Sequence, residues 1–402
     1  MVGNNVMGKR MRQQLDSAVA ALYAGRLTRR GFLRCGLTLG VSSWCLRDIL
    51  ARHAAAAAVP ALPEPQVLEK IKKEGKRLFV YNWEDYIHPH TIPQFEKEFG
   101  VKVTYDTFPG NEQLLAKLQT GGARYDVIFP THNFLPIYIA QGLLAPLRHE
   151  NLPNLQNLFE KFRTTLFDPT NTYAVPYGWG MTAMAYNTKV VRDDPNVGSW
   201  ALLFQSGPQR YSGKLGFTDE REEVIAAALQ FLGFSANSRS RDELQQAGEL
   251  LLRLKPHIKA FYPGVEAKKA LITEDIVVAQ SWSGETVKAN AKNPAVVWSL
   301  PKEGGTGWFD VMAVPKTAPH KFTAEVFINY MLRPDVAADN ANTTGYATAN
   351  RVAAEKYVAP QVANNPSIYP SSDILARVTF LETIPDALLP LYEELWTRLL
   401  TA

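Results

Sequence analysis

Cysteine is scarce in this sequence: the 402 residues contain two, Cys35 and Cys45. Both lie in the first 58 residues, so the chain from residue 59 onward has no thiol. Residues 59–402 therefore cannot form a disulfide, use a thiolate nucleophile or bind a metal through cysteine. Histidine is also rare, and no Gly-x-Ser-x-Gly, phosphate-binding or His-Glu-x-x-His motif is present. These absences argue against an enzyme, and no cofactor is expected.

Long apolar runs and excess basic charge are missing from the same part of the chain. No apolar run after residue 58 approaches the roughly 18–20 residues needed to span a bilayer, so we expect a soluble product. The formal charge of +4 also comes from residues 1–58, which hold nine basic and two acidic residues. The remainder holds 34 basic and 37 acidic residues. A nucleic-acid partner is therefore not expected.

The N-terminal segment is typical of an export signal. Arg29 and Arg30 precede an apolar stretch that ends in the small residues 54–58. This pattern resembles a twin-arginine signal, which predicts transport of the folded chain by the twin-arginine translocon and a periplasmic location. We assign residues 1–58 to the signal and 59–75 to a leader, extended through Gln66 because of its three prolines.

The rest of the chain alternates between strand and helix patterns. Residues 78–83, 101–105 and 125–129 are predicted strands. Helices are predicted between them, at 91–99, which Gly100 ends, and at 111–119, which Asn111 caps. This order predicts a parallel sheet covered by helices. The pattern returns later, with helices at 222–233 and 324–331 and strands at 276–279 and 295–300. Two α/β lobes are therefore expected.

Tryptophan and acidic residues recur together where these strands are expected to end. Trp83 precedes two acids, Trp282 is followed by Glu285, and Asp310 follows Trp308. Ligands of open parallel sheets bind beyond the carboxyl ends of strands. An indole face attracts an ammonium by about 0.5–2 kcal/mol, and a buried ammonium also needs a carboxylate. Each methylene packed between rings adds about 0.8 kcal/mol. The pattern favours a linear polyamine as ligand.

Six motifs, in this order, resemble the periplasmic spermidine/putrescine-binding proteins, the substrate-binding components of polyamine ABC importers. They are YNWEDY at 81–86, YDVIFP at 125–130, FDP at 167–169, YAVPYGWG at 173–180, PKEGG at 301–305 and LRPDV at 332–336. The resemblance implies a two-lobed α/β periplasmic binding protein fold, each lobe a mainly parallel sheet flanked by helices, joined by hinge crossings. It places 76–180 plus 308–354 in the N-terminal lobe and 181–307 plus 355–402 in the C-terminal lobe, with the ligand trapped between them.

The resemblance also implies a ligand site, carried over position by position. Its aromatic members pack against the ligand: Trp83, Tyr86, Trp282, Trp308 and Tyr346. Its acidic members pair with amines: Asp85, Glu220, Glu223, Glu285 and Asp310. Thr131 supplies a hydroxyl contact. No catalytic residue or metal ligand is implied, the partner is an inner-membrane ABC permease that docks the closed form, and the protein is expected to be a monomer.

The exact ligand stays open at this point. Asn133 and Glu220 depart from spermidine-type members, Glu285 resembles putrescine-type members, and Glu382 replaces a neutral amide, so a short diamine is favoured. Agmatine, another organic cation or a sensor role remain alternatives. A ferric-ion site is disfavoured because Tyr346 has no tyrosine neighbour. An anionic ligand is disfavoured because acids, rather than arginine, occupy the strand ends.

Overall fold

The computed structural model describes residues 64–121 and 124–402. The predicted signal at 1–58 and the leader up to residue 63 lie outside the described residues. The first element of the described residues is helix α4 (Pro65–Lys73). The predicted extended segment is therefore wrong at Pro65 and Gln66, because proline fits the first turn of a helix, where its missing N–H costs nothing. In the described part of the chain, no helix is both long and apolar enough to cross a membrane.

Residues 77–128 form the predicted parallel unit. Strands β1 (Arg77–Trp83), β2 (Lys102–Phe108) and β3 (Val127–Ile128) lie in the order β2-β1-β3, and both pairings are parallel. Helix α5 (Thr91–Phe99) connects β1 to β2 and ends, as predicted, at Gly100, whose φ of 67° is left-handed. Helix α6 (Asn111–Gln119) connects β2 to β3.

The start of α6 differs from the prediction that Asn111 caps it. The capping position is Gly110, and Asn111 belongs to the first helical turn. The Asn111 amide instead donates to Thr131 Oγ1 and its oxygen accepts from the Thr131 N–H, both at 3.0 Å. Asn111 therefore ties the start of α6 to the segment that follows β3.

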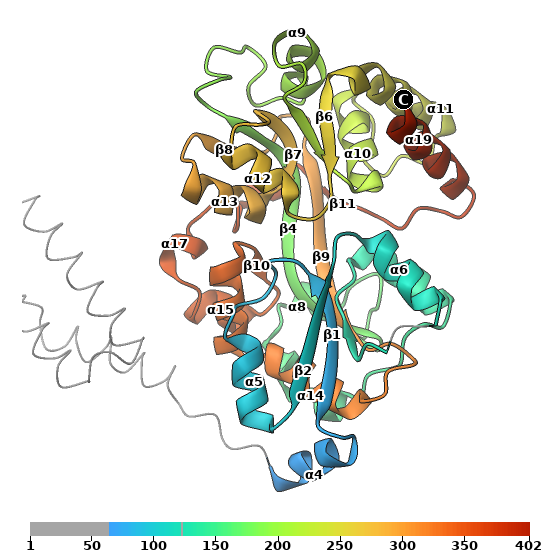
Figure 1. Ribbon diagram of the computed structural model, residues 1–402, viewed down its shortest axis with the longest axis vertical. Coiled ribbons are helices and arrows are strands. Elements are labelled where there is room, and N and C mark those ends of the chain that lie inside the picture. The colour runs from blue at the N-terminus through green and yellow to red at the C-terminus, as the bar shows by residue number, and fades with distance from the viewer. Residues whose placement is uncertain (1–63, 122–123) are drawn as a thin grey trace, which may run out of the picture. The chain divides into compact units, whose positions relative to one another are not determined.

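Two long antiparallel strands join the halves of the molecule (Figure 1). Strand β4 (Ala174–Asn187) pairs with β9 (Gly305–Ala313) up to Thr182. From Thr182 onward it pairs with β7 (Val278–Trp282) on one edge, and from Met184 onward with β8 (Val296–Ser299) on the other. Strand β9 also pairs with β3. In the described residues, eleven strands thus form one mixed sheet, with the main order β2-β1-β3-β9-β4-β7-β5-β6.

The second lobe repeats the parallel arrangement. Strand β5 (Leu215–Thr218) pairs in parallel with β6 (Ile258–Tyr262) and with β7. The helices around it are α9 (Gly207–Arg210), α10 (Arg221–Phe231), α11 (Arg241–Leu254), α12 (Glu266–Ile272), α13 (Ser283–Lys292) and α19 (Leu389–Thr401). The predicted two-lobed α/β architecture is confirmed, with antiparallel β4 and β9 linking the two parallel parts.

The remaining elements surround the first lobe and the crossing. The helices are α7 (Leu135–Ala140), α8 (Glu160–Arg163), α14 (Lys321–Met331), α15 (Pro334–Thr344), α16 (Arg351–Lys356), α17 (Pro360–Ala363) and α18 (Ser372–Leu375). Strand β10 (Ala347–Thr348) pairs with β4, and β11 (Val378–Phe380) pairs with β9. Because β4, β9 and β11 lie side by side, the chain passes between the lobes on a narrow bundle of strands.

Two main clusters of buried apolar side chains form the cores. The first takes residues from 71–179 and from 308–368, and the second takes residues from 184–278 and from 388–399. Val362 and Ile368 belong to the first cluster, although they follow residue 354. Each cluster is built from two separate parts of the chain, so each lobe needs the strands that cross between them.

Candidate functional site

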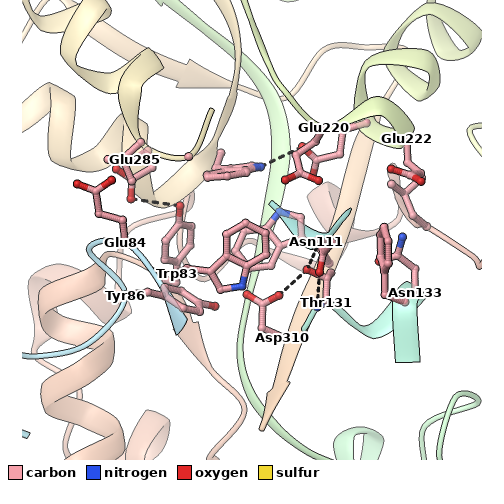
Figure 2. A pocket seen from close by; sticks show the side chains of 18 residues that line it. Trp83, Glu84, Tyr86, Asn111, Thr131, Asn133, Glu220, Glu222, Glu285 and Asp310 are labelled. Atoms are coloured by element: carbon pink, nitrogen blue, oxygen red, sulfur yellow. Dashed lines mark hydrogen bonds between the residues drawn. The ribbon is translucent and has the colours of Figure 1, made fainter. Parts of the chain in front are cut away.

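A pocket with an empty volume of about 660 Å³, partly open to solvent, lies where the two lobes meet (Figure 2). Its walls contain ten of the residues predicted from the sequence: Trp83, Tyr86, Thr131, Glu220, Glu223, Trp282, Glu285, Trp308, Asp310 and Tyr346. The first lobe contributes the end of β1, the segment after β3 and part of β9. The second lobe contributes the start of α10, the end of β7 and the start of α13. One predicted member, Asp85, is not part of the lining.

The aromatic side chains are held in fixed orientations. Trp83 Nε1 donates to the carbonyl of Phe129 at 2.8 Å, and its ring meets Trp282 edge-on at 5.9 Å between centroids. This contact joins the two lobes. Tyr346 stands edge-on to both Tyr86, at 5.4 Å, and Trp308, at 5.1 Å. The rings form a wall of apolar faces that is available to pack against an aliphatic chain.

Asp310 is buried in the floor of the pocket. The sequence pattern placed Trp308 and Asp310 at a strand end, but that expectation is wrong, because both lie inside β9. The Thr131 hydroxyl donates to Asp310 Oδ1 at 2.8 Å. Burial raises the pKa of Asp310 to about 7, although the hydrogen bond from Thr131 opposes the shift. A carboxylate in this position is costly to ionise without a cation beside it.

Glu223 lies in the first turn of α10, across the pocket from β9. Its carboxylate accepts hydrogen bonds from Thr182 Oγ1 at 2.6 Å and from Trp282 Nε1 at 2.9 Å. Burial nevertheless raises the pKa of Glu223 to about 7. The Thr182 hydroxyl also accepts from Trp308 Nε1 at 3.1 Å, so this residue of β4 links a wall residue of each lobe. Sequence reasoning missed Thr182 because nothing local distinguishes it from the rest of β4.

Glu220 immediately precedes α10 and is also buried. Its Oε1 atom has no hydrogen-bond partner among the described residues. Burial raises the pKa of Glu220 well above its usual range, and the carboxylates of Glu112, Glu223 and Glu222 raise it further. The helix dipole at the start of α10 favours acids there. The dipole does not account for Asp310, which lies on β9. A cationic ligand would account for all of the buried carboxylates in the pocket that have no ion pair.

Several lining residues were not among the predicted site residues. They are Glu84, Asn111, Asn133, Phe134, Glu222, Gly264, Val265 and Leu381. Glu84 and Glu222 are sequence neighbours of predicted members, so the same motifs could have indicated them. Gly264, Val265 and Leu381 carry no polar signal and reach the pocket only through the packing of the loops after β6 and β11. Glu382, which was weighed for ligand type, is not in the lining and pairs with Arg239 at 3.0 Å.

Asp85 is the one predicted site residue that does not line the pocket. It adopts a left-handed conformation with φ of 54° just after β1. Its carboxylate Oδ2 lies 2.6 Å from the Nζ atom of Lys268, on α12 of the second lobe. The hydrogen bond from Lys268 lowers the pKa of Asp85. The amine that Asp85 meets in this structure is therefore a lysine of the chain itself.

The polar groups divide into two kinds around the pocket. Asp310, Glu220 and Glu223 carry pKa values shifted upward by burial, whereas Glu285 forms ion pairs with two lysines. Among residues 64–121 and 124–402, no group of three or more His, Cys, Asp or Glu side chains is arranged to hold a metal ion. The site combines indole faces with unpaired carboxylates, which is the chemistry that holds an organic cation.

Comparisons with known proteins agree with this architecture. The family model described as bacterial extracellular solute-binding protein matches residues 91–370. The putrescine-binding periplasmic protein of Escherichia coli is 37% identical over 340 residues, which cover 81% of this chain and 91% of that protein. The spermidine/putrescine-binding periplasmic protein of Salmonella typhimurium is 36% identical over 353 residues, covering 87% and 98%.

A solved structure with the same fold is the spermidine/putrescine ABC transporter substrate-binding protein of Streptococcus pneumoniae. It is 30% identical, covers 81% of this chain and 99% of its own, and superimposes with a TM-score of 0.68. The family model matches more than half of the chain, and these relatives are similar over most of its length. The chain belongs to the family of bacterial extracellular solute-binding proteins.

Proposed function

We propose that this protein is a periplasmic substrate-binding protein that captures a polyamine, putrescine or spermidine, and delivers it to an ABC importer. The observation that carries the proposal is the set of buried carboxylates, Asp310, Glu220 and Glu223, in a pocket walled by tryptophan and tyrosine. The names of the relatives from Escherichia coli and Salmonella typhimurium support the same class of ligand. They also support a periplasmic location. We propose no catalytic role.

A protonated amine would supply the missing counter-charge. Burial raises the pKa values of Asp310 and Glu223 to about 7, so each carboxyl group is costly to ionise without a cation beside it. An ammonium beside it removes that cost through a charge-assisted hydrogen bond. The methylene spacers would then pack against Trp83, Trp282 and Tyr346, leaving water at about 0.8 kcal/mol per CH₂.

The proposed ligand contacts are the ten predicted residues that line the pocket, with Glu84, Asn133 and Glu222 as additional polar neighbours. Asp85 stands at the edge through its pairing with Lys268. Since β4 and β9 cross between the lobes, we propose that bending of these strands opens and closes the pocket. The closed form would then dock on an inner-membrane permease, with the binding protein acting as a monomer.

Export would proceed through the twin-arginine translocon. Arg29 and Arg30, followed by an apolar stretch and small residues, support this pathway. Residues 59–402 contain no cysteine, so folding before export would require no disulfide.

Calorimetry of the purified protein tests the proposal. Bound ligand is first removed by unfolding and refolding, and the protein is then titrated with putrescine, spermidine, agmatine and, as an anionic control, glutamate. We expect low-micromolar or tighter binding of at least one polyamine, about −8 kcal/mol or more favourable, and no heat with glutamate. Absence of heat with all three amines, for protein that shows a normal unfolding transition, contradicts the proposal.

A further inference from the structure

An ammonium group, that of Lys268, lies beside one end of the pocket, where it pairs with Glu285 of the lining. This residue lies on α12 in the second lobe, and its side chain is only 11% exposed. Its Nζ atom is 2.6 Å from Asp85 Oδ2, in the first lobe, and 2.7 Å from Glu285 Oε2, in the wall of the pocket. Two carboxylates facing one ammonium across the junction of two lobes is the arrangement that a bound amine terminus would adopt.

A second lysine completes the charge balance at this end. Lys288, on α13, forms an ion pair with Glu285, and its Nζ donates to the backbone carbonyl of Asp85 at 3.3 Å. It also lies over the Tyr346 ring, 5.8 Å from the centroid. The positive charges of Lys268 and Lys288 offset the negative charges of Asp85 and Glu285. Glu84, the other acid of the lining here, is exposed to solvent, where its field is screened.

The rest of the pocket has the reverse balance. Asp310, Glu220 and Glu223 form no ion pair in the part of the chain that the structure describes, and Arg221 nearby pairs with Glu222 at 2.8 Å. Figure 2 shows Glu285 on one side of the aromatic wall, with Glu220, Glu222 and Asn133 on the other. Ligand charge is therefore attracted to the buried carboxylates, whereas on the side of Lys268 the lining acid without an ion pair, Glu84, is exposed to solvent.

We propose that Lys268 is a specificity-determining residue, whose ammonium fills the amine position between Asp85 and Glu285 and so favours a diamine over a longer triamine. The inference rests on the proposed function and narrows its substrate class. A third ligand ammonium reaching this end would meet two lysines whose counter-charges are already engaged. Like charges a few ångströms apart in a partly buried site repel strongly.

Two substitutions test the proposal with opposite expected signs. Lys268→Met keeps most of the length of the side chain but removes its charge, which frees Asp85 and the Oε2 atom of Glu285 for a ligand amine, while Lys288 still pairs with Oε1. We expect the affinity for spermidine relative to putrescine to rise about tenfold or more. Asp85→Asn removes one counter-charge of Lys268. The Asp85 side chain is half exposed, so the substitution should have little effect on folding. It makes this end more positive by one charge, so the same ratio should fall.

Two control variants separate this effect from general changes in charge. Lys292→Met removes an exposed lysine from the last turn of α13, the helix that begins beside Glu285, so the spermidine-to-putrescine ratio should stay at the wild-type value. Lys268→Arg keeps the positive charge and should retain the preference for the diamine. All variants are titrated by calorimetry at the same low ionic strength, after their unfolding transitions have been checked.

The possible results distinguish a failure of the role of Lys268 from a failure of polyamine binding itself. If wild-type protein binds an amine but Lys268→Met changes the affinities for spermidine and putrescine equally, Lys268 only holds the two lobes together. That result overturns the proposal. The same holds if Asp85→Asn and Lys268→Met shift the ratio in the same direction. If folded wild-type protein binds neither amine, the proposed function itself fails and the inference falls with it.

Discussion

The Thr131 hydroxyl donates a 2.8 Å hydrogen bond to Asp310 Oδ1, although the two residues are 179 positions apart in the chain. Asn111, at the start of α6, holds Thr131 from the other side. The chain Asn111–Thr131–Asp310 thus fixes one carboxylate at the floor of the pocket. It leaves the carboxylate without a cation, so a ligand ammonium can supply the counter-charge.

Replacing Asp310 with asparagine should weaken polyamine binding by about 2–5 kcal/mol, because a desolvated ammonium loses its counter-charge. Asparagine preserves the size of the side chain and can still accept from Thr131. Calorimetric titration measures the loss, with Asp193→Asn, at an exposed position, as the charge-matched control. Wild-type affinity in the Asp310 variant would remove this residue from the ligand contacts.

Polyamine affinity should increase between about pH 5.5 and pH 8. Burial raises the pKa values of Asp310 and Glu223 to about 7 in the free protein, so below pH 7 both are partly protonated. The ligand ammonium binds their ionised forms, and protons must therefore be released on binding. Titrations at pH 6 in buffers of different ionisation enthalpy count these protons. Affinity that is flat with pH, with no proton release, would contradict ionisation of these carboxyls on binding.

The same pKa shift has an opposite effect on the stability of the ligand-free protein. The folded-state pKa of Asp310 lies above its unfolded value, so its contribution to stability is fully present below about pH 4 and is lost as the pH rises through 7. Denaturation of wild type and Asp310→Asn at pH 4.5 and pH 8 tests this. We expect the variant to gain stability relative to wild type at pH 8, on the order of 3 kcal/mol. Saturating ligand should reverse the pH trend of the wild type.

Trp282→Ala should reduce affinity by about 1–3 kcal/mol through the loss of packing against the ligand. Trp282→Phe is the informative companion, because it keeps an aromatic face but removes the 2.9 Å hydrogen bond from Nε1 to Glu223. That bond favours the ionised carboxylate, so the phenylalanine variant should retain most of its affinity at pH 8 and lose more at pH 6. Wild-type affinity in the alanine variant would make Trp282 purely structural.

Replacing both Arg29 and Arg30 with lysine should abolish export, because the paired arginine is the feature that a twin-arginine translocon recognises. Cell fractionation followed by immunoblotting measures the outcome. The variant should remain in the cytoplasm with its presequence attached, whereas wild type reaches the periplasm. Normal export of the double variant would show that another pathway carries this protein.

Local sequence patterns predicted the framework correctly. The helix at 91–99 ends where Gly100 takes a left-handed conformation, as a glycine after a helix does. The strand around 78–83 also forms, and Trp83 lies at its carboxyl end. Such features depend on residues within one or two turns of chain, so they can be derived without knowing what packs nearby.

Features that depend on residues distant in the chain were harder to predict from the sequence. Asn111 was expected to cap α6, but it turns toward Thr131, and Asp310 was expected outside a strand, but it lies within β9. Both differences arise where the long strands β4 and β9 bring separate segments together. Strand pairing between residues more than a hundred positions apart leaves no periodic signal near either residue.

The sequence alone determined the types of residue available to the site, acids and aromatic rings without cysteine, and the order of strands and helices that carry them. Only the tertiary structure decided which carboxylates are left without a cation and which are neutralised: Lys268 reaches Asp85 across 183 residues of chain and joins Glu285. The physical reason is that the state of a carboxyl group depends on burial and on charges within a few ångströms. Those distances exist only once the two lobes have packed together.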